Sequence, residues 1–195
     1  MSSRYTGEVD DETFRLFYGA AWLNLIGTYT GRRRPPVFER LTSPERLADW
    51  LAAVGLAPAD SPADDDVVAA IELREALYEL ARAAVDDRGP EAAAVRALNR
   101  ALRHDTTPSV RVEGDELIGS RPRTATEAVG RIARQAAEHL TGPERARLRG
   151  CADPTCAGIY LDDSGRRRWC ADATCGVRNR VRAHRERARD DVEPA

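Results

Sequence analysis

The chain has 195 residues, of which 42% are hydrophobic and 32% charged, and its formal net charge is −2 at pH 7. This length suits one domain with an appended module, and the near-neutral total excludes a chain that is basic throughout. The charge is uneven, because residues 143–189 hold 12 arginines and 6 acidic residues, a net of +6. This asymmetry indicates an anionic partner for the C-terminal part, the alternative being a solvated charged helix.

The first residues are polar and acidic and lack the apolar run of a secretory signal, and no apolar stretch approaches the length of a membrane span. We therefore expect a cytoplasmic protein with reduced thiols and no membrane partner. Apart from three histidines, every basic residue is an arginine. The placement of the arginines is therefore more informative than their number.

Residues 14–26 are rich in aromatic and aliphatic side chains, and their periodicity is compatible with a helix or a strand. Aromatic residues are otherwise scarce, at 6% of the chain. With nearby polar anchors they would form an apolar pocket for a small-molecule effector, the alternative being that they simply fill the core. The candidate pocket residues are Tyr18, Trp22, Asn24, Thr28 and Trp50.

Helical signals follow along the chain. Ser43 begins a predicted helix that ends near Gly55, because serine caps a helix and the proline after it suits the first position. Amphipathic spacing predicts further helices over 67–85, 90–102 and 124–140. Residues 109–118 predict a β-hairpin around a Glu-Gly-Asp turn. Residues 1–142 are therefore predicted to form a mainly helical domain with a small β element.

The four cysteines lie in two loops that match at five of six positions, Cys-Ala-Asp-Pro-Thr-Cys and Cys-Ala-Asp-Ala-Thr-Cys. Two such turns with paired thiols predict one tetrahedral all-thiolate site with no open position for water. We expect a single structural Zn²⁺ ion. The alternatives are an iron–sulfur cluster, whose usual spacing differs, and disulfides, which need an oxidising compartment. The predicted ligands are Cys151, Cys156, Cys170 and Cys175.

A strand and a helix complete the C-terminal pattern. Ile159 and Leu161 flank a tyrosine before an Asp-Asp-Ser-Gly turn, so a β-hairpin is predicted between the two loops. The residues after the second loop have helical spacing. An apolar stripe begins at Val177 and recurs every three or four residues, and we expect this stripe to pack on the hairpin. Loop, hairpin, loop and helix in this order predict a treble-clef zinc finger over residues 143–195. The arginines along the margins of the stripe are the predicted DNA contacts: Arg178, Arg180, Arg182, Arg185 and Arg189.

The dipeptides Trp169-Cys170 and Cys175-Gly176, followed by a basic helix, resemble the CGNR zinc finger, which closes bacterial proteins of the ABATE family. The segments Leu-Thr-Ser-Pro-Glu-Arg-Leu-Ala-Asp-Trp-Leu at 41–51 and Arg-Ile-Ala-Arg-Gln-Ala-Ala at 131–137 are also similar to that family. The resemblance covers nearly the whole chain and implies a bacterial stress-induced transcription regulator. Val177 stands where the family has asparagine, so another group must replace that asparagine's hydrogen bonds.

The resemblance and the arginine helix together predict a zinc-dependent transcription regulator whose finger binds double-stranded DNA. Its N-terminal domain would sense a small-molecule effector or mediate assembly, and a homodimer is expected because one small finger is weakly selective. The alternatives are a finger that binds protein or RNA, and an N-terminal domain with small-molecule-binding or catalytic activity. We expect no enzyme, because the sequence holds no glycine-rich phosphate loop and no G-x-S-x-G or H-E-x-x-H motif.

Overall fold

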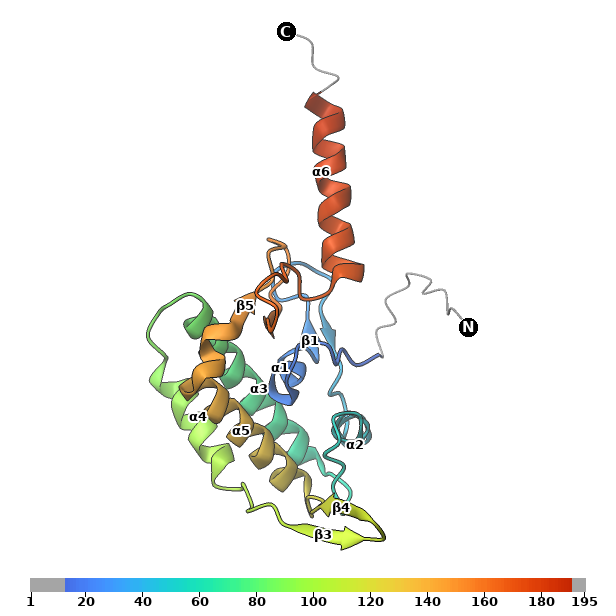
Figure 1. The fold of residues 1–195 in the computed structure, drawn as a ribbon, viewed down its shortest axis with the longest axis vertical. Helices are drawn as coiled ribbons and strands as arrows, with labels where there is room; N and C mark the ends of the chain where they lie inside the picture. Colours follow the sequence, from blue (N-terminus) through green and yellow to red (C-terminus); the bar gives the residue numbers. More distant parts are fainter. Residues whose placement is uncertain (1–12, 191–195) are drawn as a thin grey trace.

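Three long helices form the body of the molecule. The computed structural model describes residues 13–190, and the three helices pack side by side in it (Figure 1). The fifth helix approaches its neighbours closely because its buried face carries small residues such as Ala128. Gly130 is a tight point of this packing, since a Cβ atom there would lie 2.5 Å from the backbone nitrogen of Asp105. The three helices are α3 (Asp64–Val85), α4 (Ala92–Leu102) and α5 (Ala125–Thr141).

Two shorter helices cover this body. α2 (Pro44–Ala53) begins as predicted, because the Ser43 hydroxyl accepts a hydrogen bond from the backbone nitrogen of Arg46 at 3.3 Å. The aromatic N-terminal segment forms a single short helix, α1 (Ala21–Ile26), which resolves the ambiguity of its periodicity. Each of the two helices contributes one fully buried tryptophan to the core: Trp22 and Trp50.

The strands of the described residues form three antiparallel pairs. The pairs are β1 (Tyr29–Thr30) with β2 (Phe38–Glu39), β3 (Val110–Glu113) with β4 (Glu116–Gly119), and β5 (Leu148–Gly150) with β6 (Ile159–Leu161). The predicted hairpin of residues 109–118 is confirmed as β3 and β4. The predicted fold class is also confirmed, because the chain is mainly helical with a few short strands and its cysteines cluster in the C-terminal unit. Among residues 13–190, no helix combines the length and the apolar character needed to cross a membrane.

A buried arginine ties α3 to the β1–β2 segment. Arg74 is only 2% exposed, and its Nη1 and Nη2 atoms donate to the Glu39 carboxylate at 2.6 and 2.7 Å. Its Nε atom donates to Glu75 at 2.9 Å, and Glu75 also accepts two hydrogen bonds from Arg32 at 2.6 and 2.9 Å. Alternating charges joined by several hydrogen bonds make the burial of this cluster tolerable. The loop between β1 and β2 is thereby fixed against α3.

The predicted hairpin between the two cysteine loops is wrong. The strand at 159–161 exists, but it pairs with β5, which precedes the first cysteine, and not with residues 166–169. On its other edge, the Leu161 backbone nitrogen donates to the carbonyl of Tyr18 at 3.0 Å, so no edge remains for a third strand. After β6, the Asp162 carboxylate accepts hydrogen bonds from the backbone and the hydroxyl of the serine two residues later, which turns the chain toward the second loop.

The C-terminal unit shares one hydrophobic core with the helical body. Leu148 and Ile159, on β5 and β6, are 3% and 1% exposed and belong to the same buried cluster as Trp22. β5 also packs against side chains of α3, because a Cβ atom on Gly150 would lie 3.3 Å from Nη1 of Arg82 and 3.4 Å from a methyl group of Val85. The predicted division at residues 142 and 143 therefore does not separate two independent cores.

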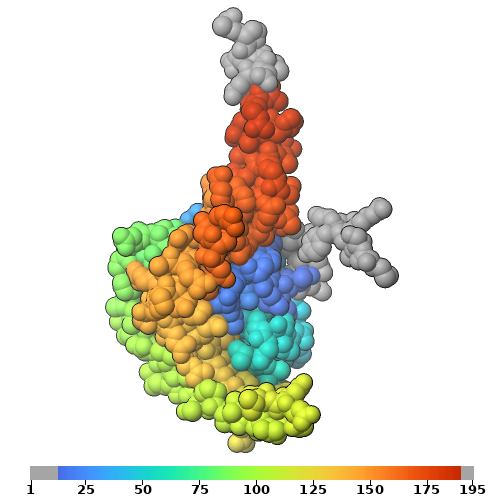
Figure 2. All heavy atoms as spheres, viewed as in Figure 1, coloured from blue at the N-terminus to red at the C-terminus, as the bar shows by residue number. Residues whose placement is uncertain are grey.

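The last helix, α6 (Val177–Asp190), leaves this body and extends into solvent (Figures 1 and 2). The expectation that its apolar stripe packs on the hairpin is wrong, because Val177 and Val181 are 44% and 43% exposed. His184, farther along the stripe, is exposed as well. The predicted helix exists, but the contacts that hold it come from its first two turns.

Candidate metal centre

Four cysteine sulfur atoms converge beside the base of α6. All four Sγ atoms lie within 4.8 Å of one another, and the Cys156–Cys170 and Cys170–Cys175 separations are each 3.6 Å. A tetrahedral ion with metal–sulfur bonds of about 2.3 Å requires sulfur–sulfur distances of about 3.8 Å. The cluster therefore fits such an ion, and its separations are far longer than a disulfide bond. All four predicted ligands are brought together: Cys151, Cys156, Cys170 and Cys175.

Hydrogen-bond donors point at three of these sulfur atoms. N–H groups so placed stabilise thiolates and orient metal ligands. Gly158 supplies one of them and has no room for a side chain, because a Cβ atom there would lie 3.0 Å from Cys170 Sγ. The pairs are Gly158 N to Cys156 Sγ at 3.3 Å, Cys170 N to Cys151 Sγ at 3.4 Å, and Arg178 Nη2 to Cys175 Sγ at 3.2 Å.

Without a cation the four thiols compete for protons. A hydrogen bond with Cys156 lowers the pKa of Cys151, whereas a hydrogen bond with Cys151 raises the pKa of Cys170. The hydrogen bond with Cys151 opposes ionisation of Cys175, but those with Cys156 and Cys170 outweigh it and lower the pKa of Cys175 to about 6. A divalent cation removes this competition, because all four thiols can then ionise together.

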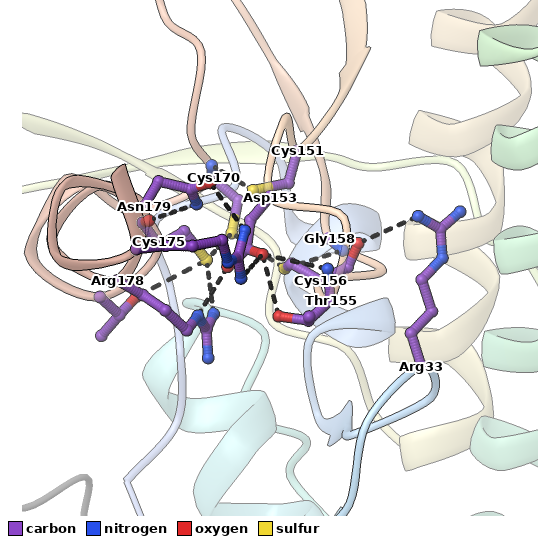
Figure 3. Close-up of polar contacts among 12 residues, drawn as sticks. Arg33, Cys151, Asp153, Thr155, Cys156, Gly158, Cys170, Cys175, Arg178 and Asn179 are labelled. Carbon is purple, nitrogen blue, oxygen red and sulfur yellow. Dashed lines mark hydrogen bonds and ion pairs between the residues drawn. The ribbon is translucent and has the colours of Figure 1, made fainter. Parts of the chain in front are cut away.

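The aspartate of the first cysteine loop anchors α6. Asp153 is fully buried, and its carboxylate accepts hydrogen bonds from the backbone nitrogen and the hydroxyl of Thr155 at 3.0 and 2.9 Å. It also forms ion pairs with Arg178 at 2.6 Å and Arg182 at 3.4 Å (Figure 3). Burial opposes its charge, but these hydrogen bonds outweigh that effect and hold the pKa of Asp153 below its ordinary value. One carboxylate thus attaches two turns of α6 to the first loop.

The second cysteine loop forms a similar aspartate–arginine contact with α6, but this contact is exposed to solvent. Asp172 has the position of Asp153 in the repeat, and it accepts hydrogen bonds from Arg180 at 2.9 and 3.2 Å. Its side chain is 71% exposed, so this pair contributes little to stability. Sequence reasoning did not assign a role to either aspartate. The signal was present, because both loops carry aspartate at the same position.

A side-chain hydrogen bond closes the turn at the base of α6, where Val177 stands in place of the family asparagine. The Nδ2 atom of Asn179, two residues after Val177, donates to the backbone carbonyl of Cys175 at 2.8 Å. Gly176 has no room for a side chain, because a Cβ atom there would collide with the carboxylate of Asp172. The asparagine two positions later therefore closes the first turn of the helix against the metal ligands.

The predicted DNA-binding arginines fall into two groups. Arg185 and Arg189 are exposed and form no ion pair with any residue in the range 13–189. Arg187, between them, is likewise exposed and without an acidic partner in that range. The other three predicted contacts are paired with the aspartates of the cysteine loops: Arg178, Arg180 and Arg182.

Most of the candidate pocket residues lie in the core. Trp22 is fully buried, and its Nε1 atom donates to Nδ1 of His139 on α5 at 3.1 Å. Among the five, Tyr18 alone is found in the wall of a cleft detected in the described residues. The large apolar surface of the tryptophans explains the outcome, since its burial stabilises the fold more than a pocket wall would. All five candidates are buried: Tyr18, Trp22, Asn24, Thr28 and Trp50.

Fold and site together define a class of protein, in which a helical domain shares its core with a four-cysteine metal-binding unit that ends in a basic helix. Residues 19–143 match the family model ABATE, described as "Putative stress-induced transcription regulator", and residues 147–188 match the CGNR zinc finger. The first match covers more than half of the chain, so the chain belongs to the ABATE family, as the resemblance predicted. A search of curated proteins found no match.

Proposed function

We propose that the protein is a zinc-dependent transcription regulator that binds double-stranded DNA through α6. The observation that carries this proposal is the free basic helix, whose Arg185, Arg187 and Arg189 have no acidic partner in the described residues. An α-helix with its side chains is about 10–12 Å across and the major groove of B-DNA is about 12 Å wide, so such a helix fits the groove. Membership of a family named for transcription regulation supports the same role.

The metal in this proposal is one Zn²⁺ ion per chain. Four thiolates complete a tetrahedral shell, so the ion holds the two loops and the base of α6 together and has no open position for a substrate. The protein accordingly acts by binding and not by catalysis. Of its histidines, His139 already accepts a hydrogen bond from Trp22, and His184 lies on the exposed helix.

The arginines of α6 would contact mainly phosphates, with one or two of them reaching guanine edges. Because Arg178 and Arg182 are held by Asp153, the contacts made at lowest cost come from the distal half of the helix. One helix of this size gives weak selectivity, so we expect a homodimer to place two such helices on the duplex. The N-terminal domain then provides assembly or senses an effector.

The test replaces Arg185, Arg187 and Arg189 together by alanine and measures the binding of a labelled random-sequence duplex by fluorescence anisotropy over a range of salt concentrations. We expect weaker binding and a slope of log affinity against log salt that is shallower by about 2 to 3, because three phosphate contacts are lost. Zinc content and circular dichroism are measured in parallel, since the metal centre does not involve these three residues.

A matched control replaces three exposed arginines on α4 and its C-terminal cap instead: Arg96, Arg100 and Arg103. This variant has the same net charge as the α6 variant, and we expect it to bind the duplex as the wild type does. Equal affinity and equal salt slope in the α6 variant and the wild type would contradict the proposal.

One observation favours a second candidate function, in which α6 binds a protein. Val177 and Val181 are more than 40% exposed on the same side of the helix, and such apolar side chains usually pack against something. Replacing both by serine discriminates the two functions. If the variant binds DNA with unchanged affinity, the DNA role is favoured. If the wild-type protein binds no duplex at any salt concentration, the protein-binding role is favoured instead.

A further inference from the structure

An open cleft of about 350 Å³ lies where the N-terminal segment, the β1–β2 loop and the first cysteine loop meet. Tyr18 and Phe38 line it from the helical domain, and Gly158 lines it from the finger. Its volume falls within the range of about 300–1,000 Å³ that is usual for small-molecule sites. Sites between two structural units are also where such ligands are commonly found.

The cleft is strongly cationic. Among the described residues that line it are four arginines and neither an aspartate nor a glutamate. Two of the four are already neutralised, because Arg32 binds Glu75 and Arg178 binds Asp153. The remaining two are Arg15 and Arg34, and Arg34 forms no ion pair within residues 13–189.

The rest of the wall is apolar. Leu23, Ile26 and Ile159 are nearly or fully buried and form its floor, and Phe38 and two prolines of the β1–β2 loop form its rim. Apolar walls with a few convergent polar groups are the usual form of a small-molecule site. The arginines supply donors that match an oxyanion, and the apolar surface suits a ring-sized body attached to it.

We propose that this cleft binds a small organic anion, in which one carboxylate or phosphate group contacts Arg15 and Arg34 and an apolar body lies against Tyr18 and Ile159. The two acidic groups share the chemistry that arginine recognises, since both present planar or tetrahedral arrays of oxygen acceptors to the guanidinium. Neither Trp22 nor Trp50, which are buried in the core, lines this cleft.

The position of the cleft also connects the ligand to α6, a consequence that rests on the proposed DNA-binding function. Arg178 lines the cleft and is at the same time the residue that joins α6 to Asp153 and Cys175 (Figure 3). The β1–β2 loop, which lines the cleft as well, contacts the first cysteine loop, because Arg33 Nη1 donates to the Cys156 carbonyl at 3.4 Å. An anion that accepts a hydrogen bond from Arg178 competes with Asp153 and so loosens the base of α6.

The experiment is isothermal titration of the full-length, metal-loaded protein with 2-naphthoate and 2-naphthyl phosphate, and with the uncharged 2-naphthamide as a matched probe. No DNA is present, so its outcome is independent of the DNA-binding proposal. We expect both anions to bind about tenfold or more tightly than the amide, because charge-assisted hydrogen bonds to arginine are lost in the amide. Arg15→Gln combined with Arg34→Gln should remove this preference, whereas Arg96→Gln on α4 should retain it.

A second variant, Ala157→Phe, leaves the arginines in place and fills the cleft from the side of the first cysteine loop. We expect it to abolish anion binding while circular dichroism and metal content stay unchanged. The proposal is overturned if neither anion binds saturably, if anions and amide bind alike, or if Arg96→Gln weakens binding as much as the double variant. Where anion binding is confirmed, repeating the DNA titration with saturating 2-naphthoate should change DNA affinity by about 5- to 150-fold.

Discussion

Two aspartates that are identical in sequence context have different environments in the structure. Asp153 is fully buried and holds two arginines of α6, whereas the side chain of Asp172 is 71% exposed and holds one. The difference follows from their partners, because Asp153 is bound by Thr155 and two arginines, whereas Asp172 is bound by Arg180 at the surface. The two aspartates of the repeat therefore contribute unequally to holding α6 in place.

This inequality predicts a difference in metal affinity. Asp153→Asn removes the charge that positions Arg178 beside Cys175, so we expect Zn²⁺ affinity to fall about 10- to 100-fold, as is usual for groups behind metal ligands. Competition with a chromogenic chelator measures the change. Asp172→Asn serves as the control and should shift affinity far less, and equal effects of the two substitutions would refute the assigned role of Asp153.

The burial of Trp22 leads to a prediction about stability. Trp22→Ala removes a fully buried indole and its hydrogen bond to His139, and large-to-small changes of this kind cost about 3–5 kcal/mol. Urea denaturation followed by circular dichroism measures the free energy of unfolding. Phe17→Ala, at a neighbouring ring that is 41% exposed, should cost much less. A Trp22→Ala protein as stable as the wild type would contradict the placement of this residue in the core.

At the scale of elements, an ion-pair network joins α3 to the β1–β2 segment that forms one wall of the cationic cleft. Burial opposes the charge of Glu75, but hydrogen bonds from Arg32 and Arg74 outweigh it and lower its pKa. A lowered pKa in the folded state means that the stabilisation is fully present above the unfolded value of about 4.3 and is lost as the pH falls through the folded value.

We therefore expect Glu75→Gln to destabilise the protein near pH 7 and to lose that difference from the wild type as the pH falls through the lowered pKa of Glu75, where the native carboxylate becomes protonated. Because the side chain of Glu75 is 45% exposed, the difference at neutral pH should be only about 1 kcal/mol. Unfolding curves at several pH values measure it. Any release of metal by acid affects both proteins equally, so the comparison isolates Glu75, and a difference that does not change with pH would argue against this pairing.

The helix α6 is held at one end, and this predicts a gradient of protection along it. Asn179, Arg178 and Arg182 tie the first two turns to the cysteine loops, whereas residues 183–190 rest on helix propensity, and short isolated helices are marginal in water. Hydrogen exchange monitored by mass spectrometry should show fast exchange in 183–190 and slower exchange in 177–182. Addition of duplex DNA should slow exchange in the distal half, and equal protection along the free helix would rule out attachment at its base alone.

At the scale of the whole molecule, the finger and the helical body share one hydrophobic core, so we expect them to unfold together. Leu148 and Ile159 lie in the same core cluster as Trp22, and Gly150 packs against α3. Cys170→Ser should therefore lower the melting temperature of the entire chain and not only melt the finger. Calorimetry should show a single transition in both proteins, and an unchanged N-terminal transition in the variant would restore the picture of two independent domains.

The elements predicted from sequence were those with strong local signals. Ser43 and Pro44 mark a helix start through a contact three residues away, and the cysteine ligands are defined by two short repeats. The pairing of β6 with β5, and the ion pairs of Asp153 with arginines 25 and 29 residues later, depend on segments separated in the chain, and no local pattern encodes them. The exposed Val177 stripe shows a further limit, since helical periodicity identifies an apolar face but not whether a partner covers it.

Because α6 is attached only at its base, a small rotation at the base produces a larger displacement at its far end. Its 14 residues span about 21 Å at about 1.5 Å per residue. A tilt of about 10° at the base displaces the far end by about 3.7 Å, which is close to the rise of about 3.4 Å per nucleotide along the axis of B-DNA. A rearrangement around Arg178 that leaves the fold intact would therefore shift the terminal arginines by about the axial rise of one base pair.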